Sequence, residues 1–103
     1  MNRKFYKYDF DRKVPMREVE NSLLLAVLAV ECLYGRSGIR NDAVFELHLK
    51  KRSCVIDAAT DIGGSIARIF TGFLCQEFGE EVFKVKRVGN GNLYRQSQAK
   101  TPV

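Results

Sequence analysis

The most constraining feature of this chain is an unbroken run of eight apolar residues at positions 23–30, which Cys32, Leu33 and Tyr34 extend almost to Gly35. As a helix, residues 23–34 would be about 18 Å long, well short of the ~30 Å hydrocarbon core of a bilayer. Twenty-two residues precede the run, and four of them are acidic, which is too long and too acidic for the first region of a signal peptide. The run therefore predicts a buried helix in a cytoplasmic domain that makes no membrane contact.

A hydrophobic fraction of 46% and a charged fraction of 28% are typical of a globular protein, and 103 residues suffice for one domain with a modest core. The chain becomes polar and aperiodic from Gly89 onward, which indicates a single domain over residues 1–88 and a disordered tail over residues 89–103. The cysteines Cys32, Cys54 and Cys75 are widely spaced without a C-x-x-C pair, so we expect free thiols in a reducing compartment.

Four short segments alternate between apolar and polar residues, as half-buried strands do: residues 4–10, 43–49, 53–58 and 81–87. Two longer segments have apolar residues at helical spacing, one from about Pro15 to Tyr34 and one over residues 61–78. Residues 36–42 are predicted to form a loop. This order predicts an α+β fold, a ferredoxin-like β-α-β-β-α-β two-layer sandwich with two helices on one face of a four-stranded antiparallel sheet.

The first predicted helix is apolar on two sides. One side, which includes Val19, Leu23 and Val30, is suited to cover the sheet. The other side consists of four residues: Leu25, Leu28, Ala29 and Cys32. The second helix, the C-terminal tail or another copy of the chain could cover it. Because contiguous exposed apolar patches usually mark interfaces and two-fold homodimers are the commonest oligomers, we expect a homo-oligomer, with a dimer favoured.

The sequence contains no arrangement of reactive side chains that supports a catalytic or metal site. His48 and Cys54 are close in the chain, but strand alternation places them on opposite faces of the predicted hairpin. Asp9 and Asp57 fall at opposite ends of neighbouring antiparallel strands, too far apart for paired acid and base catalysis. One histidine and no clustered thiols provide too few zinc ligands, so we expect a non-enzymatic protein without a metal or cofactor.

The net charge of +5 lies entirely at the two ends of the chain, because residues 14–87 carry equal numbers of acidic and basic side chains. These basic ends, together with Lys50, Lys51 and Arg52, are suited to weak contacts with phosphates. A weak RNA- or DNA-binding module is therefore an alternative function, although the neutral middle of the chain makes nucleic acid a less favoured partner than a second copy.

The turn from Thr60 to Ser65 opens the second predicted helix with Gly63 and Gly64, and Arg68 follows one helical turn later. Backbone amides at a helix start attract anions, so Gly63, Gly64 and Arg68 are weak candidates for anion contacts. The turn matches neither a P-loop nor a dinucleotide-binding glycine pattern, and nearby acidic residues oppose a phosphate.

The leading prediction is a small non-enzymatic domain that acts through homo-oligomerisation and partner binding. A second alternative is a small-ligand or enzyme site near Arg36, Arg40 and the turn over residues 60–65, completed across a subunit boundary.

Overall fold

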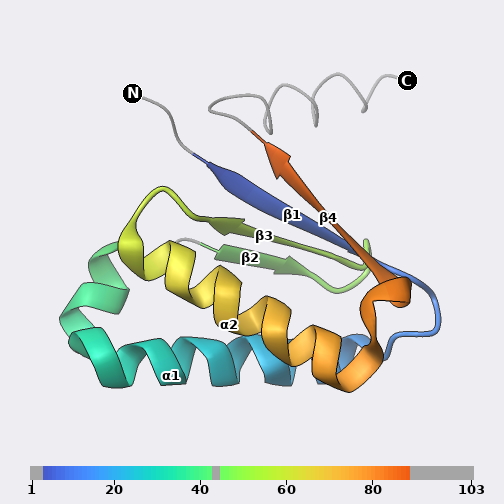
Figure 1. The fold of residues 1–103 in the computed structure, drawn as a ribbon, viewed down its shortest axis with the longest axis horizontal. Coiled ribbons are helices and arrows are strands. Elements are labelled where there is room, and N and C mark those ends of the chain that lie inside the picture. The colour runs from blue at the N-terminus through green and yellow to red at the C-terminus, as the bar shows by residue number, and fades with distance from the viewer. Residues whose placement is uncertain (1–3, 43–44, 89–103) are drawn as a thin grey trace.

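The computed structural model describes residues 4–42 and 45–88, and for residues 37–42 it describes the backbone alone; the predicted tail over residues 89–103 lies outside this range. Its elements follow the chain as shown in Figure 1. They are β1 (Phe5–Phe10), α1 (Met16–Asp42), β2 (Phe45–His48), β3 (Ser53–Asp57), α2 (Asp61–Phe78), the short 3-10 helix η1 (Glu80–Val82) and β4 (Phe83–Val88).

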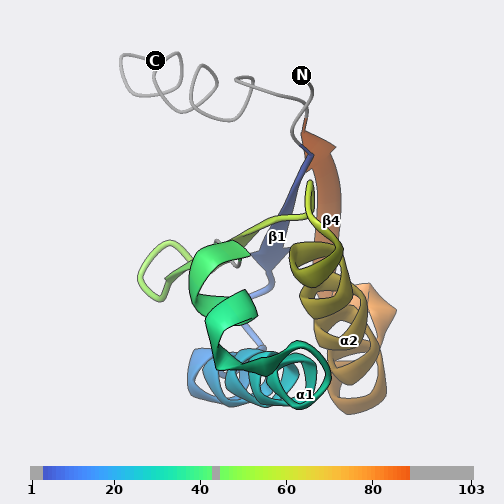
Figure 2. The ribbon, with the colours of Figure 1, turned by 90° about the vertical axis from the view of Figure 1, so that its left-hand side faces the viewer.

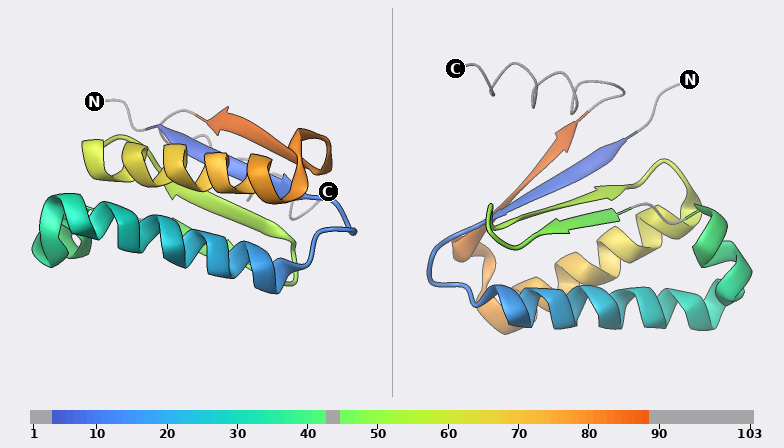
Figure 3. Two further views of the ribbon diagram at one scale, coloured as in Figure 1. Left: turned by 60° about the horizontal axis from the view of Figure 1, so that its bottom comes forward. Right: turned by 180° about the vertical axis from the view of Figure 1, so that it is seen from behind.

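The strands form one sheet in the order β2-β3-β1-β4, in which every neighbouring pair is antiparallel. Both helices lie on the same side of this sheet (Figures 1 and 3). The α+β class, the four-stranded antiparallel sheet and the two helices are thereby confirmed for the described residues. The ferredoxin-like assignment of this strand order stays a prediction.

Alternation divides the side chains of β1 between two faces, as the sequence predicts. Tyr8 faces the helices and is buried, and its ring meets Phe70 of α2 edge-on at a centroid distance of 5.0 Å. The opposite, open face carries Phe5, which is only 6% exposed because it packs with Val88 and Val55. The open face therefore has a small apolar cluster of its own.

α1 contains a break at Gly35, whose φ of 86° and ψ of 163° are not helical. Glycine adopts such a positive φ readily and other residues rarely do, so the straight part of the helix ends where the sequence predicts. The helix then resumes and continues to Asp42, and the predicted loop over residues 36–42 is wrong. A positive-φ glycine ends one helix, but it does not prevent the next residues, which include no proline, from starting another at an angle (Figure 1).

α2 follows β3 through a short turn that is held by side chains. Thr60 is the N-cap residue, and its Oγ1 accepts a hydrogen bond from the Gly63 amide at 3.0 Å. The Asp57 Oδ1 accepts a hydrogen bond from the Ala59 amide at 2.9 Å. These contacts satisfy amides that a helix start leaves without partners, so the turn is a defined structure and not an open loop.

The two helices share one core beneath the sheet. From α1 the buried apolar residues are Met16, Val19, Leu23, Ala26 and Val30, and from α2 they are Ile62, Ile66, Ala67, Phe70 and Leu74. A partly buried polar contact also joins the helices, because the Ser22 hydroxyl donates to Glu77 Oε1 at 2.8 Å. Contact with α2 thus fixes which side of α1 is buried and which side remains exposed.

Candidate functional site

One side of α1 is exposed and is formed mainly by leucines. Leu24, Leu25 and Leu28 are 56%, 55% and 54% exposed, and Cys32 is exposed as well. We call these four residues the leucine face. They share one side of the helix, because residues three, four and seven positions apart lie close together on its surface. Neither α2 nor the sheet covers them.

Three of the four predicted interface residues belong to the leucine face, whereas Ala29 is half-buried at its edge. Leu24 was not predicted, although the sequence contains a signal for it, since Leu24 and Leu28 are four residues apart. The exposed residues Asn21 and Glu18 continue the same row toward the start of the helix. The face therefore has an apolar centre with a polar border, which is the usual anatomy of a protein interface.

The three basic residues at the β2–β3 turn have different surroundings. Lys50 and Lys51 are exposed. The Arg52 Nη2 donates hydrogen bonds to three backbone carbonyls in the loop between β1 and α1: those of Asp11 at 2.6 Å, Arg12 at 3.0 Å and Val14. The guanidinium of Arg52 is thus engaged in a structural contact, which reduces its availability for phosphates.

The open face of the sheet carries both basic and acidic side chains, and among the residues described the exposed ring on it is the imidazole of His48. Lys7 lies opposite Lys86 in the β1–β4 register, and Phe5 is buried. Sheets that bind single-stranded RNA stack its bases on exposed aromatic side chains. The described part of this face therefore provides charge but no exposed phenylalanine, tyrosine or tryptophan on which bases could stack, and nucleic-acid binding stays a prediction.

The glycines of the turn at residues 60–65 have structural explanations. The Gly63 amide donates to Thr60 Oγ1 at 3.0 Å and the Gly64 amide donates to the Thr60 carbonyl at 2.8 Å. A Cβ on Gly63 would lie 1.9 Å from the Asp57 carbonyl oxygen, so only glycine fits where α2 passes the end of β3. Both amides are used within the turn, which weakens the predicted role of these residues in anion binding.

The arginines predicted near this turn are not equivalent. The Arg36 Nε donates to Glu31 Oε2 at 3.0 Å, and the side chain of Arg40 lies outside the description. Arg68 is exposed and forms no ion pair or hydrogen bond through its side chain with any described residue. It borders a cavity of about 280 Å³ at the start of α2, which Tyr34 also lines.

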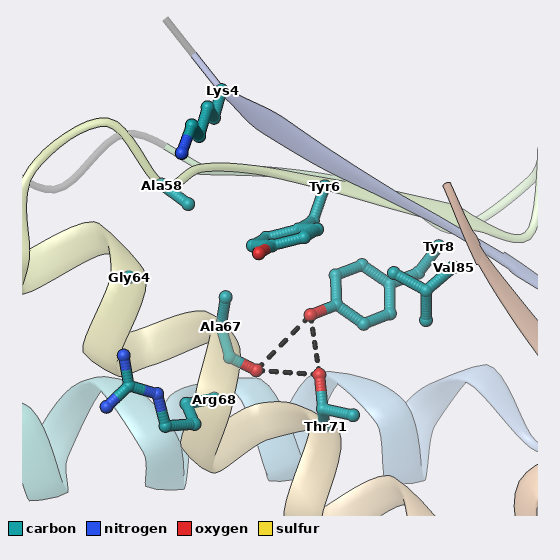
Figure 4. Close-up of a pocket in the computed structure, with 9 residues that line it drawn as sticks. All are labelled: Lys4, Tyr6, Tyr8, Ala58, Gly64, Ala67, Arg68, Thr71 and Val85. Atoms are coloured by element: carbon teal, nitrogen blue, oxygen red, sulfur yellow. Dashed lines mark hydrogen bonds between the residues drawn. The ribbon is translucent and has the colours of Figure 1, made fainter. Parts of the chain in front are cut away.

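A second cavity, with a volume of about 430 Å³, lies between β1, β4 and α2 (Figure 4). We call it the β1–α2 pocket. Its lining residues are Lys4, Tyr6, Tyr8, Ala58, Gly64, Ala67, Arg68, Thr71 and Val85. The pocket exists because β1 and β4 rise away from the helices toward the start of β1 (Figures 1 and 2) and because three of the four α2 residues that line it, Gly64, Ala67 and Thr71, are small. No pattern in the sequence indicates this pocket.

Hydroxyl groups join β1 to α2 inside the β1–α2 pocket. The Tyr8 hydroxyl lies 2.7 Å from Thr71 Oγ1 and 3.2 Å from the Ala67 carbonyl oxygen, and the Thr71 hydroxyl donates to the same carbonyl at 2.7 Å. Burial raises the pKa of Tyr8 to about 12, although its hydrogen bond with Thr71 opposes this shift. Tyr8 is therefore neutral at physiological pH and serves as an anchor between the two layers.

The three cysteines are free, and within the described part of the chain no group of three or more histidine, cysteine or acidic side chains is placed to hold a metal ion. No helix in this part is both long and apolar enough to cross a bilayer. Searches of protein-family models, curated protein sequences and solved structures gave no significant match to the chain.

Proposed function

We propose that this chain is a small non-enzymatic domain that associates with a second copy of itself through the leucine face of α1. The observation that carries the proposal is that three neighbouring leucines on one helix are each more than half exposed. Full burial of a leucine is favourable by about 1.5–3 kcal/mol, so each of these side chains forgoes roughly half of that amount. A two-fold axis would cover the face with its own copy, which is the commonest symmetry of soluble oligomers.

The leucine face is large enough for weak packing against the same helix of a second copy. Leu25, Leu28 and Cys32 follow the alternating spacing of three and four residues that helix-packing seams use, and Leu24 lies beside this row. Six half-exposed leucines, three from each copy, would contribute about 5–9 kcal/mol when covered. Because association costs at least about 4 kcal/mol of lost translational and rotational freedom and a net free energy of about 4 kcal/mol corresponds to a millimolar complex, we expect a weak dimer with a dissociation constant of roughly 0.2–1 mM.

The edges of the sheet are less suited to association than the helix. The edge strand β4 carries three exposed basic residues, Lys84, Lys86 and Arg87, and the other edge strand, β2, is only four residues long. Charged side chains and short strands are common devices that prevent the edge-to-edge pairing of sheets. The leucine face is therefore the surface on which a second copy is expected.

Sedimentation equilibrium at loading concentrations up to about 200 µM tests the proposal. The parent chain should behave as a reversible monomer and dimer. Leu28→Glu would place a charge at the centre of the leucine face and should give the monomer mass throughout. Leu49→Glu is the matched control, because Leu49 is 47% exposed but lies at the β2–β3 turn. It should associate as the parent does.

A parent chain that sediments only as a monomer across this range would reject the proposal. Unchanged association of Leu28→Glu would show that the copies meet elsewhere. Because Leu28 is exposed in the single chain, its replacement should leave the circular dichroism spectrum and the melting temperature of the monomer unaltered, which separates lost association from lost folding.

We also infer that the strand order, which runs β4-β1-β3-β2 from the opposite edge, is the ferredoxin-like arrangement. Support comes from the antiparallel pairing of each strand with its neighbours and from the helices that follow β1 and β3. This assignment does not choose among functions, because such folds host many unrelated ones.

A further inference from the structure

We infer that the β1–α2 pocket binds a small organic anion, in which a carboxylate or phosphate group is carried on an apolar body. The pocket volume of about 430 Å³ lies within the range of roughly 300–1,000 Å³ that is usual for small-molecule sites. The inference does not depend on self-association, because the pocket is lined by β1, β4, α2 and their flanking residues, whereas the leucine face belongs to α1.

The charged residues of the pocket are both cationic. Lys4 and Arg68 line it, and no acidic side chain does. Among the described residues, neither side chain forms an ion pair or a hydrogen bond. Figure 4 shows the Lys4 ammonium group and the Arg68 guanidinium group on the same side of the pocket, the side nearest Ala58 and Gly64. Two unpaired cations beside one cavity favour an anionic group at that end.

A neutral hydrogen-bond donor is available at the same end. The Tyr6 hydroxyl points toward the cationic side of the pocket in Figure 4, and it has no hydrogen-bond partner among the described residues. The hydroxyls of Tyr8 and Thr71, in contrast, are bonded to each other and to the Ala67 carbonyl. The Tyr6 hydroxyl is therefore the uncharged group that is free to donate to an anion.

The other end of the pocket is suited to an apolar body. The Tyr8 ring and Val85 lie there, away from the two cations (Figure 4), and Val85 is 40% exposed although it faces the helical side of the sheet. Of the α2 residues that line the pocket, Gly64, Ala67 and Thr71 are too small to cover Val85, and the Arg68 guanidinium lies on the opposite, cationic side (Figure 4). A ligand body in this space would bury apolar surface that the folded chain leaves open, with its anionic group held at the opposite end.

Amide chemical shifts measured during titration with phenyl phosphate and with benzoate test the inference. Both probes combine an anion with an aromatic ring, and the tighter of the two identifies the preferred anionic group. We expect saturable shifts at the amides of Gly64, Ala67 and Thr71 at submillimolar to millimolar probe concentrations. Phenol, which has the ring without the charge, and inorganic phosphate, which has the charge without the ring, should each bind at least about tenfold more weakly.

Substitutions then identify the contacts. Arg68→Ala and Lys4→Ala should each weaken binding of the tighter probe by about tenfold or more. Arg17→Ala is the matched control, because Arg17 is an exposed arginine on α1 and its loss changes the net charge by the same amount. Absence of saturable shifts with both probes, or equal weakening by Arg17→Ala and Arg68→Ala, would overturn the inference. The titration is repeated with the Leu28→Glu variant, which should bind the probe as the parent chain does. Ligand binding is thereby tested separately from self-association.

Discussion

Replacing Arg52 by alanine should destabilise the fold by about 2–4 kcal/mol. The Nη2 atom faces the carbonyls of Asp11, Arg12 and Val14 but carries two hydrogens, so it fully satisfies two of them at a time. Hydrogen bonds that involve a charged group contribute about 1.5–3 kcal/mol each. Two such bonds would contribute about 3–6 kcal/mol, and a loss near or below the lower end of this range is expected, because Asp11 and Arg12 are exposed and water can replace the lost donor.

The backbone of Arg52 provides a second, matched variant. Its φ of 55° lies in the left-handed region, which costs a non-glycine residue roughly 1–2 kcal/mol. Alanine keeps this cost, whereas glycine does not, although glycine loses more entropy on folding. Arg52→Gly should therefore be more stable than Arg52→Ala by up to about 1 kcal/mol.

Urea unfolding followed by circular dichroism measures both effects, with Lys51→Ala as the control in the same turn. Lys51 is exposed, so its loss should change the free energy of unfolding by no more than about 0.5 kcal/mol. If Arg52→Ala were as stable as Lys51→Ala, the carbonyl contacts would not hold the loop. If Arg52→Gly were less stable than Arg52→Ala, the backbone reasoning would be refuted.

Two further predictions concern the glycines of α2 and the buried side chains of Cys54 and Tyr8. Gly63→Ala should lower the melting temperature and cost about 1–3 kcal/mol of stability, because the new Cβ would meet the Asp57 carbonyl. Gly72→Ala is the matched variant, and it should stabilise α2 by up to about 1 kcal/mol, because there is open space around its Cβ. Equal melting temperatures of the two variants would contradict this prediction. Burial raises the pKa of Cys54 from 9.0 to about 12 and that of Tyr8 from 10.0 to about 12, so the folded state favours their neutral forms. The free energy of unfolding should therefore be unaffected by these two groups below about pH 9 and should fall between about pH 9 and 12, because the unfolded chain releases these protons at lower pH than the folded chain does. In Cys54→Ala, the free energy of unfolding measured in urea should decline less steeply between about pH 9 and 12. An unchanged decline would show that the buried thiol of Cys54 does not cause it.

Local patterns predicted the elements of this fold well, because strand and helix periodicities depend on neighbouring residues alone. Residues 4–10 alternate as a half-buried strand does, and the structure divides them in this way, with Tyr8 toward the helices and Phe5 on the open face. The failure over residues 36–42 has a specific cause. Gly35 was correctly identified as a helix end, but whether a second helical segment follows depends on the direction of the chain after the break.

The two candidate surfaces differ in how far the sequence reveals them. The leucine face depends on one helix, so its central residues Leu25 and Leu28 could be found by helical geometry. Leu24 was missed because the exact rotation of α1 is set by its packing against α2, including the contact between Ser22 and Glu77. The β1–α2 pocket depends on the divergence of β1 and β4 from α2, which combines three segments distant in sequence and has no local signal.

α1 has an excess of large apolar side chains and α2 has too few on one flank, and this difference links the two proposals. α1 has more large apolar residues than one buried side can accommodate, so Leu24, Leu25 and Leu28 remain exposed. α2 has too few on its flank toward β4, where Gly64 and Ala67 leave Val85 uncovered. Folding alone would favour moving apolar bulk from the first helix to the second. A chain selected to cover one surface with a second copy and to hold a ligand at the other would retain this distribution.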